Sequence, residues 1–144
     1  VLTCTSADPE MGNDSIYHPE HPDHGSIMEA YADGRTRDAF AMIAHRPHLI
    51  PERRSTFSEP HQAAFDEEFP TLRVAERLGE ISIPALVIVG RHDRAIPPAY
   101  GRLLAEGIAG AQLVEFEESG HFPSLEEPDR FRATVADFCN GAVM

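Results

Sequence analysis

The chain has no tryptophan, only two cysteines, and half as many basic as acidic residues. Cys4 and Cys139 lie near opposite ends without a Cys-x-x-Cys spacing, which argues against a disulfide scaffold or a cysteine-rich zinc site and favours a reducing, cytoplasmic compartment. Twelve Lys and Arg against 24 Asp and Glu give a net charge of −12, whereas nucleic-acid binding depends on neutralising phosphates. No apolar run approaches the roughly 20 residues of a membrane-spanning helix. We therefore expect a globular protein without nucleic-acid or membrane partners.

The chain begins with Val1 rather than Met, and its first residues lack the charged start and apolar stretch of a signal peptide. We expect the start of the gene product to lie upstream. The length of 144 residues corresponds to about one domain.

The clearest pattern begins near residue 81. Residues 83–90 form a short apolar run closed by glycine, which is typical of a strand buried on both faces. A helix is predicted over 97–108, a second strand over 112–116, and a final helix from Pro128. This order specifies two parallel strands joined by a right-handed crossover, so the predicted fold class is α/β.

The first 80 residues are less regular. Residues 1–4 match the end of another core strand, and the following stretch is rich in Pro, Asp, His and Gly, which is typical of a loop. Helical spacing of apolar residues recurs over 26–44, with a break near Gly34, and over 71–78. We therefore divide the chain into a strand end and exit loop (1–8), a mainly helical insertion (9–80) and a C-terminal core (81–144).

Two side chains that can transfer a proton follow the two predicted strands. Asp93 comes three residues after the first strand, and His121 comes about five residues after the second. Loops that follow neighbouring parallel strands leave the sheet at one edge, so the carboxylate and the imidazole can meet there. A carboxylate that binds one imidazole nitrogen orients the ring and makes the other nitrogen a base. Alternatively, Asp93 caps a turn and His121 merely occupies a glycine-containing loop.

Residues 83–98 (IPALVIVGRHDRAIPP) and 118–128 (ESGHFPSLEEP), followed by Phe131, resemble the C-terminal part of the α/β-hydrolase fold. The resemblance is to proline iminopeptidase-like peptidases and to enol-lactonase and haloperoxidase-like hydrolases. It implies that Asp93 is the acid and His121 the general base of a Ser–Asp–His triad, that 9–80 is a helical lid, and that no cofactor is needed.

The family's nucleophile lies in a G-x-S-x-G turn, and no such pentapeptide occurs in these 144 residues. Ser26 lacks the second glycine and a preceding strand, and Ser119 is too close to His121 in the chain to serve it. We therefore expect the nucleophile and the oxyanion-hole amides on an N-terminal segment or a companion chain. The missing nucleophile is consistent with two alternatives: a truncated fragment, or one chain of a two-chain enzyme.

The predicted activity is that of a serine-type hydrolase, aminopeptidase-like in one alternative, which cleaves an ester, lactone, amide or short peptide. The same fold in dehalogenases and epoxide hydrolases uses an aspartate nucleophile, so that alternative stays open. A hypothesis of another class is a catalytically silent module that binds a ligand or a partner.

Three further patterns have two interpretations each. Three histidines at three-residue spacing (His18, His21, His24) suit a metal on a polyproline-like segment, although a solvated loop is favoured because no Glu or Cys supports the site. Acidic residues of the insertion suit a substrate amine, or simply a solvated face; they are Glu59, Asp66, Glu67 and Glu68. The basic residues of the same insertion either bind an anionic substrate or balance the charge of the acidic residues; they are Arg35, Arg37, Arg53 and Arg54.

Overall fold

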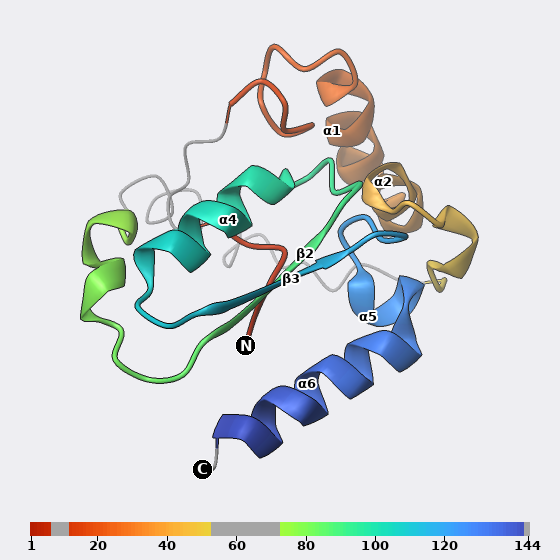
Figure 1. The fold of residues 1–144 in the computed structure, drawn as a ribbon. Coiled ribbons are helices and arrows are strands. Elements are labelled where there is room, and N and C mark those ends of the chain that lie inside the picture. Colours follow the sequence, from red (N-terminus) through yellow and green to blue (C-terminus); the bar gives the residue numbers. More distant parts are fainter. Residues whose placement is uncertain (7–11, 53–72, 143–144) are drawn as a thin grey trace.

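The computed structural model describes residues 1–6, 12–52 and 73–142. The described residues form a parallel three-stranded sheet in the order β1-β2-β3 (Figure 1). The strands are β1 (Leu2–Thr3), β2 (Leu86–Gly90) and β3 (Gln112–Phe116). The predicted α/β class and the parallel pairing are confirmed.

Strand β2 is the centre of the sheet and is buried along its whole length. Side chains alternate between the two faces of a strand. Val87 and Val89 pack with Leu104 of α4 (Pro98–Gly107). Leu86 and Ile88 lie on the other face, where the packing residues come from α6 (Pro128–Ala142): Phe131, Val135 and Phe138. The continuous apolar run therefore reflects a strand covered on both sides.

Two sequence predictions about strands need adjustment. The first strand was predicted from residue 83, but Ile83 is 70% exposed and β2 begins at Leu86. Strand β1 is present and pairs with β2, yet its two residues are only half-buried. Both differences concern the ends of strands, where fewer neighbours cover the side chains.

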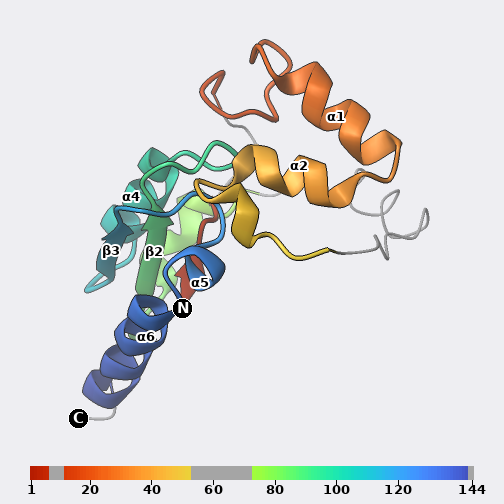
Figure 2. The same cartoon turned by 90° about the vertical axis from the view of Figure 1, so that its right-hand side faces the viewer.

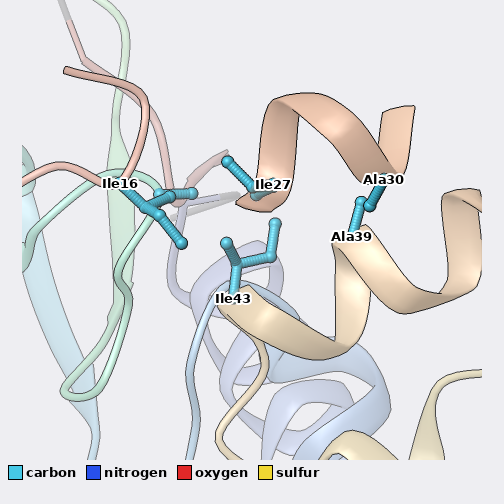
Figure 3. Close-up of a cluster of buried hydrophobic side chains, with 6 residues drawn as sticks. Ile16, Ile27, Ala30, Ala39 and Ile43 are labelled. Carbon is cyan, nitrogen blue, oxygen red and sulfur yellow. The ribbon is translucent and has the colours of Figure 1, made fainter. Parts of the chain in front are cut away.

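Helices α1 (His24–Ala32) and α2 (Thr36–Ile43) lie beyond the carboxyl ends of the strands, as Figure 2 shows. Gly34, with φ +70°, separates them at the predicted break. Their facing side chains form a small core (Figure 3), which Ile16 from the segment before α1 and Ala95 from the loop after β2 also join. The helix residues of this core are Ile27, Ala30, Ala39 and Ile43. This shared core attaches the two helices to the loop after β2.

The helical pattern over 71–78 is realised only in part. Residues 71–72 lie outside the described ranges, and Ala75–Glu80 is the 3-10 helix η3. A second 3-10 turn, η1 (Pro47–Leu49), follows α2.

A short helix, α5 (Pro123–Glu126), lies between β3 and α6, where no helix was predicted. Pro128 lacks an N–H and disfavours a helical conformation at Glu127, so α5 ends and α6 begins as a separate helix. No helix among the described residues is long and apolar enough to cross a bilayer.

Candidate functional site

Asp93 lies in the turn that follows β2. Its Oδ1 atom accepts hydrogen bonds from the backbone N–H groups of Ala95 (2.9 Å) and Ile96 (3.0 Å). This is the local bonding by which an aspartate stabilises a turn. The side chain is completely buried, so the turn fixes the direction of its second oxygen.

The loop after β3 brings His121 to the same edge of the sheet. The two loops continue the strand pairing, because the N–H groups of Arg91 and His92 donate to the carbonyls of Phe116 and Ser119, each at 2.9 Å. Gly90 is required at the crossing, since a Cβ there would lie 1.9 Å from the carbonyl oxygen of Gly120. The close approach of the two loops therefore depends on a glycine at the end of β2.

The imidazole of His121 binds the buried carboxylate of Asp93. Nδ1 and Oδ2 are 2.9 Å apart, and 24% of the His121 side chain is exposed. In the neutral ring, an Nδ1–H that donates to the carboxylate leaves Nε2 as a proton acceptor. The predicted meeting of Asp93 and His121 at one edge is thus observed, and the pair can accept and return a proton.

Cys4 lies beside this pair, directly after β1. Its sulfur lies within 4.8 Å of ligand atoms of both Asp93 and His121, and its backbone has a positive φ of 45°. Burial, reinforced by the Asp93 carboxylate, raises the pKa of the Cys4 thiol far above its usual range. A neutral thiol is a poor nucleophile, and both oxygens of Asp93 already accept hydrogen bonds, one of them shared with His121 Nδ1. The three side chains do not suit a metal ion.

The two serines considered from the sequence have other surroundings. Ser119 is buried and its hydroxyl donates to Glu127 Oε2 at 2.6 Å. That hydrogen bond, together with Arg130, holds the pKa of Glu127 below its usual range although burial works in the opposite direction. Ser26 is exposed on helix α1. Ser26 does not follow a strand, and Ser119, in the loop between β3 and α5, has its hydroxyl engaged by Glu127.

The histidine series does not form a polyproline-like segment. Successive turns connect it, with His21 N–H donating to the His18 carbonyl (2.9 Å) and His24 N–H to the His21 carbonyl (3.0 Å). A polyproline helix has no internal hydrogen bonds. Within the described ranges, these rings are not among the groups that could hold a metal ion.

The charged residues of the insertion are only partly described. Arg35 pairs with Asp33 and Asp38, and Arg37 pairs with Glu52. These ion pairs favour the charge-balance interpretation. The remaining candidates lie outside the described residues: Arg53, Arg54, Glu59, Asp66, Glu67 and Glu68.

An open cavity of about 450 Å³ lies between the end of α2 and the loop after β2. Asp93 and Arg94 contribute to its wall, together with the rings of His45 and His92, which stack with centroids 3.9 Å apart. Binding cavities typically measure about 300–1,000 Å³. The cavity has room for a small molecule. Its wall carries two imidazole rings, the carboxylate of Asp14 and two arginines, each of which pairs with an acidic residue.

The residue that the sequence interpretation missed is Glu126. It is buried, and its carboxylate accepts backbone hydrogen bonds from Gly120 and Phe122, on either side of His121. In the sequence, Glu126 and Glu127 precede Pro128, which is a common pattern at the exposed start of a helix and gave no sign that Glu126 is buried. Its burial depends on α5, which was not predicted.

Comparison with known proteins agrees with this architecture. Residues 1–134 match the model of a family described as "Alpha/beta hydrolase family". A 2-hydroxy-6-oxononadienedioate/2-hydroxy-6-oxononatrienedioate hydrolase of Klebsiella pneumoniae subsp. pneumoniae is 34% identical over 116 residues, which are 81% of this chain and 36% of that protein. A hydrolase of the same name from Pseudomonas putida is 42% identical over 97 residues, or 67% of this chain and 31% of that protein.

Solved structures give the same result. An alpha/beta fold family hydrolase from Bacillus anthracis superposes with a TM-score of 0.82 at 25% identity, covering 94% of this chain and 56% of that one. The enol-lactonase from Burkholderia xenovorans superposes with a TM-score of 0.64 at 28% identity, covering 96% of this chain and 54% of that one. The chain therefore spans about a third of these curated relatives and about half of these solved chains.

Proposed function

The chain belongs to the alpha/beta hydrolase family, and we propose that Asp93 and His121 are the acid and the general base of a serine-type hydrolase. The observation that carries the proposal is the 2.9 Å contact between His121 Nδ1 and the buried Asp93 Oδ2. In this arrangement Nε2 removes the proton from an attacking hydroxyl while the carboxylate stabilises the imidazolium that forms. The same nitrogen then returns the proton to the leaving group.

The nucleophile and the oxyanion-hole amides come from a segment outside these 144 residues, joined to the chain or supplied as a companion. Two features support this part of the proposal. No G-x-S-x-G turn is present in the sequence. In the described part of the chain, β1 pairs only with β2, so its other edge is open to a further strand. Helices α1 and α2, which lie over the carboxyl ends of the strands, then form part of a lid.

We propose a carbonyl compound that carries carboxylates as the substrate. The curated relatives are named for hydrolysis of a 2-hydroxy-6-oxo-dienedioate or trienedioate. Such a compound has no ester or amide bond, so water must cleave a carbon–carbon bond beside the 6-oxo group. The departing carbon then needs a proton, which His121 Nε2 can supply. Arg94 and the stacked rings of His45 and His92 border a cavity beside Asp93. A substrate carboxylate bound there would share the Arg94 guanidinium with Asp23.

The test uses the full-length protein that contains this chain. It is offered a 2-hydroxy-6-oxo-dienedioate, a p-nitrophenyl ester, a lactone and an amino-acid p-nitroanilide, each with wild type and with His121→Ala. We expect hydrolysis of the oxo acid to be fastest and to be lost in the variant. A fluorophosphonate should label one serine, found by mass spectrometry. An unlabelled but active enzyme would indicate an aspartate nucleophile, and an inactive full-length protein would indicate a binding module.

A further inference from the structure

Glu126 is a completely buried carboxylate in the loop region that carries the histidine. Only 1% of the residue is exposed. Its Oε2 atom accepts the N–H of Gly120 at 2.8 Å and that of Phe122 at 3.2 Å, which are the residues on either side of His121. A single carboxylate oxygen thus binds the backbone immediately before and after the catalytic ring.

The other oxygen of Glu126 connects this loop to the end of α2. Oε1 accepts the backbone N–H of Arg46 at 2.6 Å, and the guanidinium of Arg46 returns a hydrogen bond to the Glu126 carbonyl at 2.9 Å. His121 itself donates its N–H to the carbonyl of Ile43, the last residue of α2, at 3.0 Å. The backbone around the histidine is therefore held from α5 and from α2 at the same time.

These contacts determine where the imidazole can reach. Asp93 fixes the orientation of the ring, but the ring is partly exposed and is not held in place by burial alone. The position of its Cα depends on the backbone bonds on either side. A displacement of the loop by about 1 Å would stretch the contact between Nδ1 and Oδ2 beyond hydrogen-bond length, and misplacement on this scale costs about 10²-fold in rate.

A buried carboxylate persists only when its oxygens are satisfied. Among the described residues, no buried side-chain oxygen or nitrogen lacks a hydrogen-bond partner. Three N–H donors meet this requirement: those of Gly120 and Phe122 in the histidine loop, and that of Arg46 in the segment after α2. An apolar residue would pack in the same space but would leave those N–H groups unpaired.

We propose that Glu126 is a positioning residue, which holds the His121 loop against the end of α2 and so keeps Nδ1 within reach of Asp93. The proposal rests on the proposed function for its catalytic meaning, whereas the positioning itself is a property of this chain. It further implies that movement of α2 displaces the base, because α2 and Glu126 hold the same three-residue segment.

The decisive measurement is NMR of the full-length protein that contains this chain, because the signal of the His121 ring does not depend on turnover. The Nδ1–H proton of His121, bound to a carboxylate, gives a far-downfield resonance whose exchange with water can be followed. The variants are Glu126→Ala, which removes all three acceptor contacts, and Glu126→Gln, which keeps the volume and one carbonyl oxygen. Glu118→Gln is the matched control, since the exposed Glu118 pairs with the Arg46 side chain but accepts no bond from the loop amides in the described structure.

We expect the wild-type resonance in Glu118→Gln, faster exchange in Glu126→Gln and loss of the resonance in Glu126→Ala, while the amide signals of β2 and β3 stay in place. An unchanged resonance in both folded Glu126 variants would overturn the proposal. Unfolding of both would do so as well, because it would show a role in fold stability alone.

Turnover of the full-length enzyme supplies an independent measurement. There, Glu126→Gln should lower kcat by about 10²-fold with little change in KM, since a misplaced base affects the chemical step more than binding. An unchanged kcat, or a change confined to KM, would contradict positioning. If Glu126→Ala loses the NMR signal but His121→Ala leaves activity intact, the proposed function fails while the positioning of the ring stands.

Discussion

His121 and Asp93 are 28 positions apart in the sequence, and their Nδ1 and Oδ2 atoms are 2.9 Å apart in the fold. The carboxylate is sealed from solvent while the ring keeps one side open. Burial on one side and access on the other are what a base needs in order to hold its orientation and still meet a reactant.

Replacing Asp93 by Asn tests this relationship in the full-length protein. Asn can still accept the turn hydrogen bonds, but it cannot stabilise an imidazolium and it favours the wrong tautomer. We expect turnover to fall by about 10⁴-fold, measured with saturating substrate. The control is Asp129→Asn, because the Asp129 side chain is 95% exposed, and it should retain full activity. Near-wild-type turnover in Asp93→Asn would refute the assignment.

A Cβ at position 120 should push the histidine loop away from α2. It would lie 2.6 Å from both the N atom of His45 and the O atom of Ile43, and neither backbone atom can move aside easily. Gly120→Ala should lower the free energy of unfolding by about 1–3 kcal/mol in urea titrations. Gly141→Ala is the matched control, since a Cβ there meets open space within α6 and should raise stability by about 0.5–1 kcal/mol. Equal effects of the two substitutions would contradict the steric account.

The two cysteines should react at very different rates. Burial, together with the nearby Asp93 carboxylate, raises the pKa of Cys4 and keeps its thiol protonated, whereas Cys139 is exposed on α6. Thiolate is the reactive form. A disulfide reagent such as DTNB should therefore titrate one thiol of the folded chain quickly and the second only after unfolding. Cys139→Ser should remove the fast phase, and a fast phase that persists in this variant would contradict the burial of Cys4.

Stability should depend on the ionisation of Glu127 in a predictable direction. The hydrogen bond from Ser119 and the ion pair with Arg130 hold the pKa of Glu127 below its ordinary value of 4.5, against the effect of burial. Because the folded-state pKa is lowered, the stabilisation is fully present above pH 4.5 and is lost as the pH falls through the lowered value. The difference in unfolding free energy between wild type and Glu127→Gln should be constant from neutral pH down to about 5 and shrink below about 4. A difference that grows on acidification would contradict the assignment.

The C-terminal core was predictable because its elements are set by local patterns. The run ending at Gly90, the strand over 112–116 and the helix from Pro128 each follow from the alternation or periodicity of apolar residues. The parallel pairing then follows from the order of the elements, since a short crossover helix permits little else. The meeting of Asp93 with His121 is a consequence of that topology.

The predictions for the first 80 residues were weaker for a physical reason. For the histidine series, a polyproline-like segment was the less favoured of two interpretations, and the backbone groups there bond to one another in successive turns instead. The helical spacing over 71–78 yields a short 3-10 helix from Ala75. In such segments the apolar spacing alone does not decide between a turn, a 3-10 helix and an α-helix, because local hydrogen bonds and tertiary packing both contribute.

By itself, the sequence determined the α/β class, the order of the elements and the edge at which an acid and an imidazole meet, because these depend on the spacing of apolar residues and on chain topology. Only the tertiary structure decided that Glu126 is buried behind His121, that Cys4 lies beside Asp93, and that the end of α2 holds the histidine loop. Each of these relationships joins residues from separate elements, and side-chain burial and hydrogen bonding between such elements leave no periodic signal in the sequence.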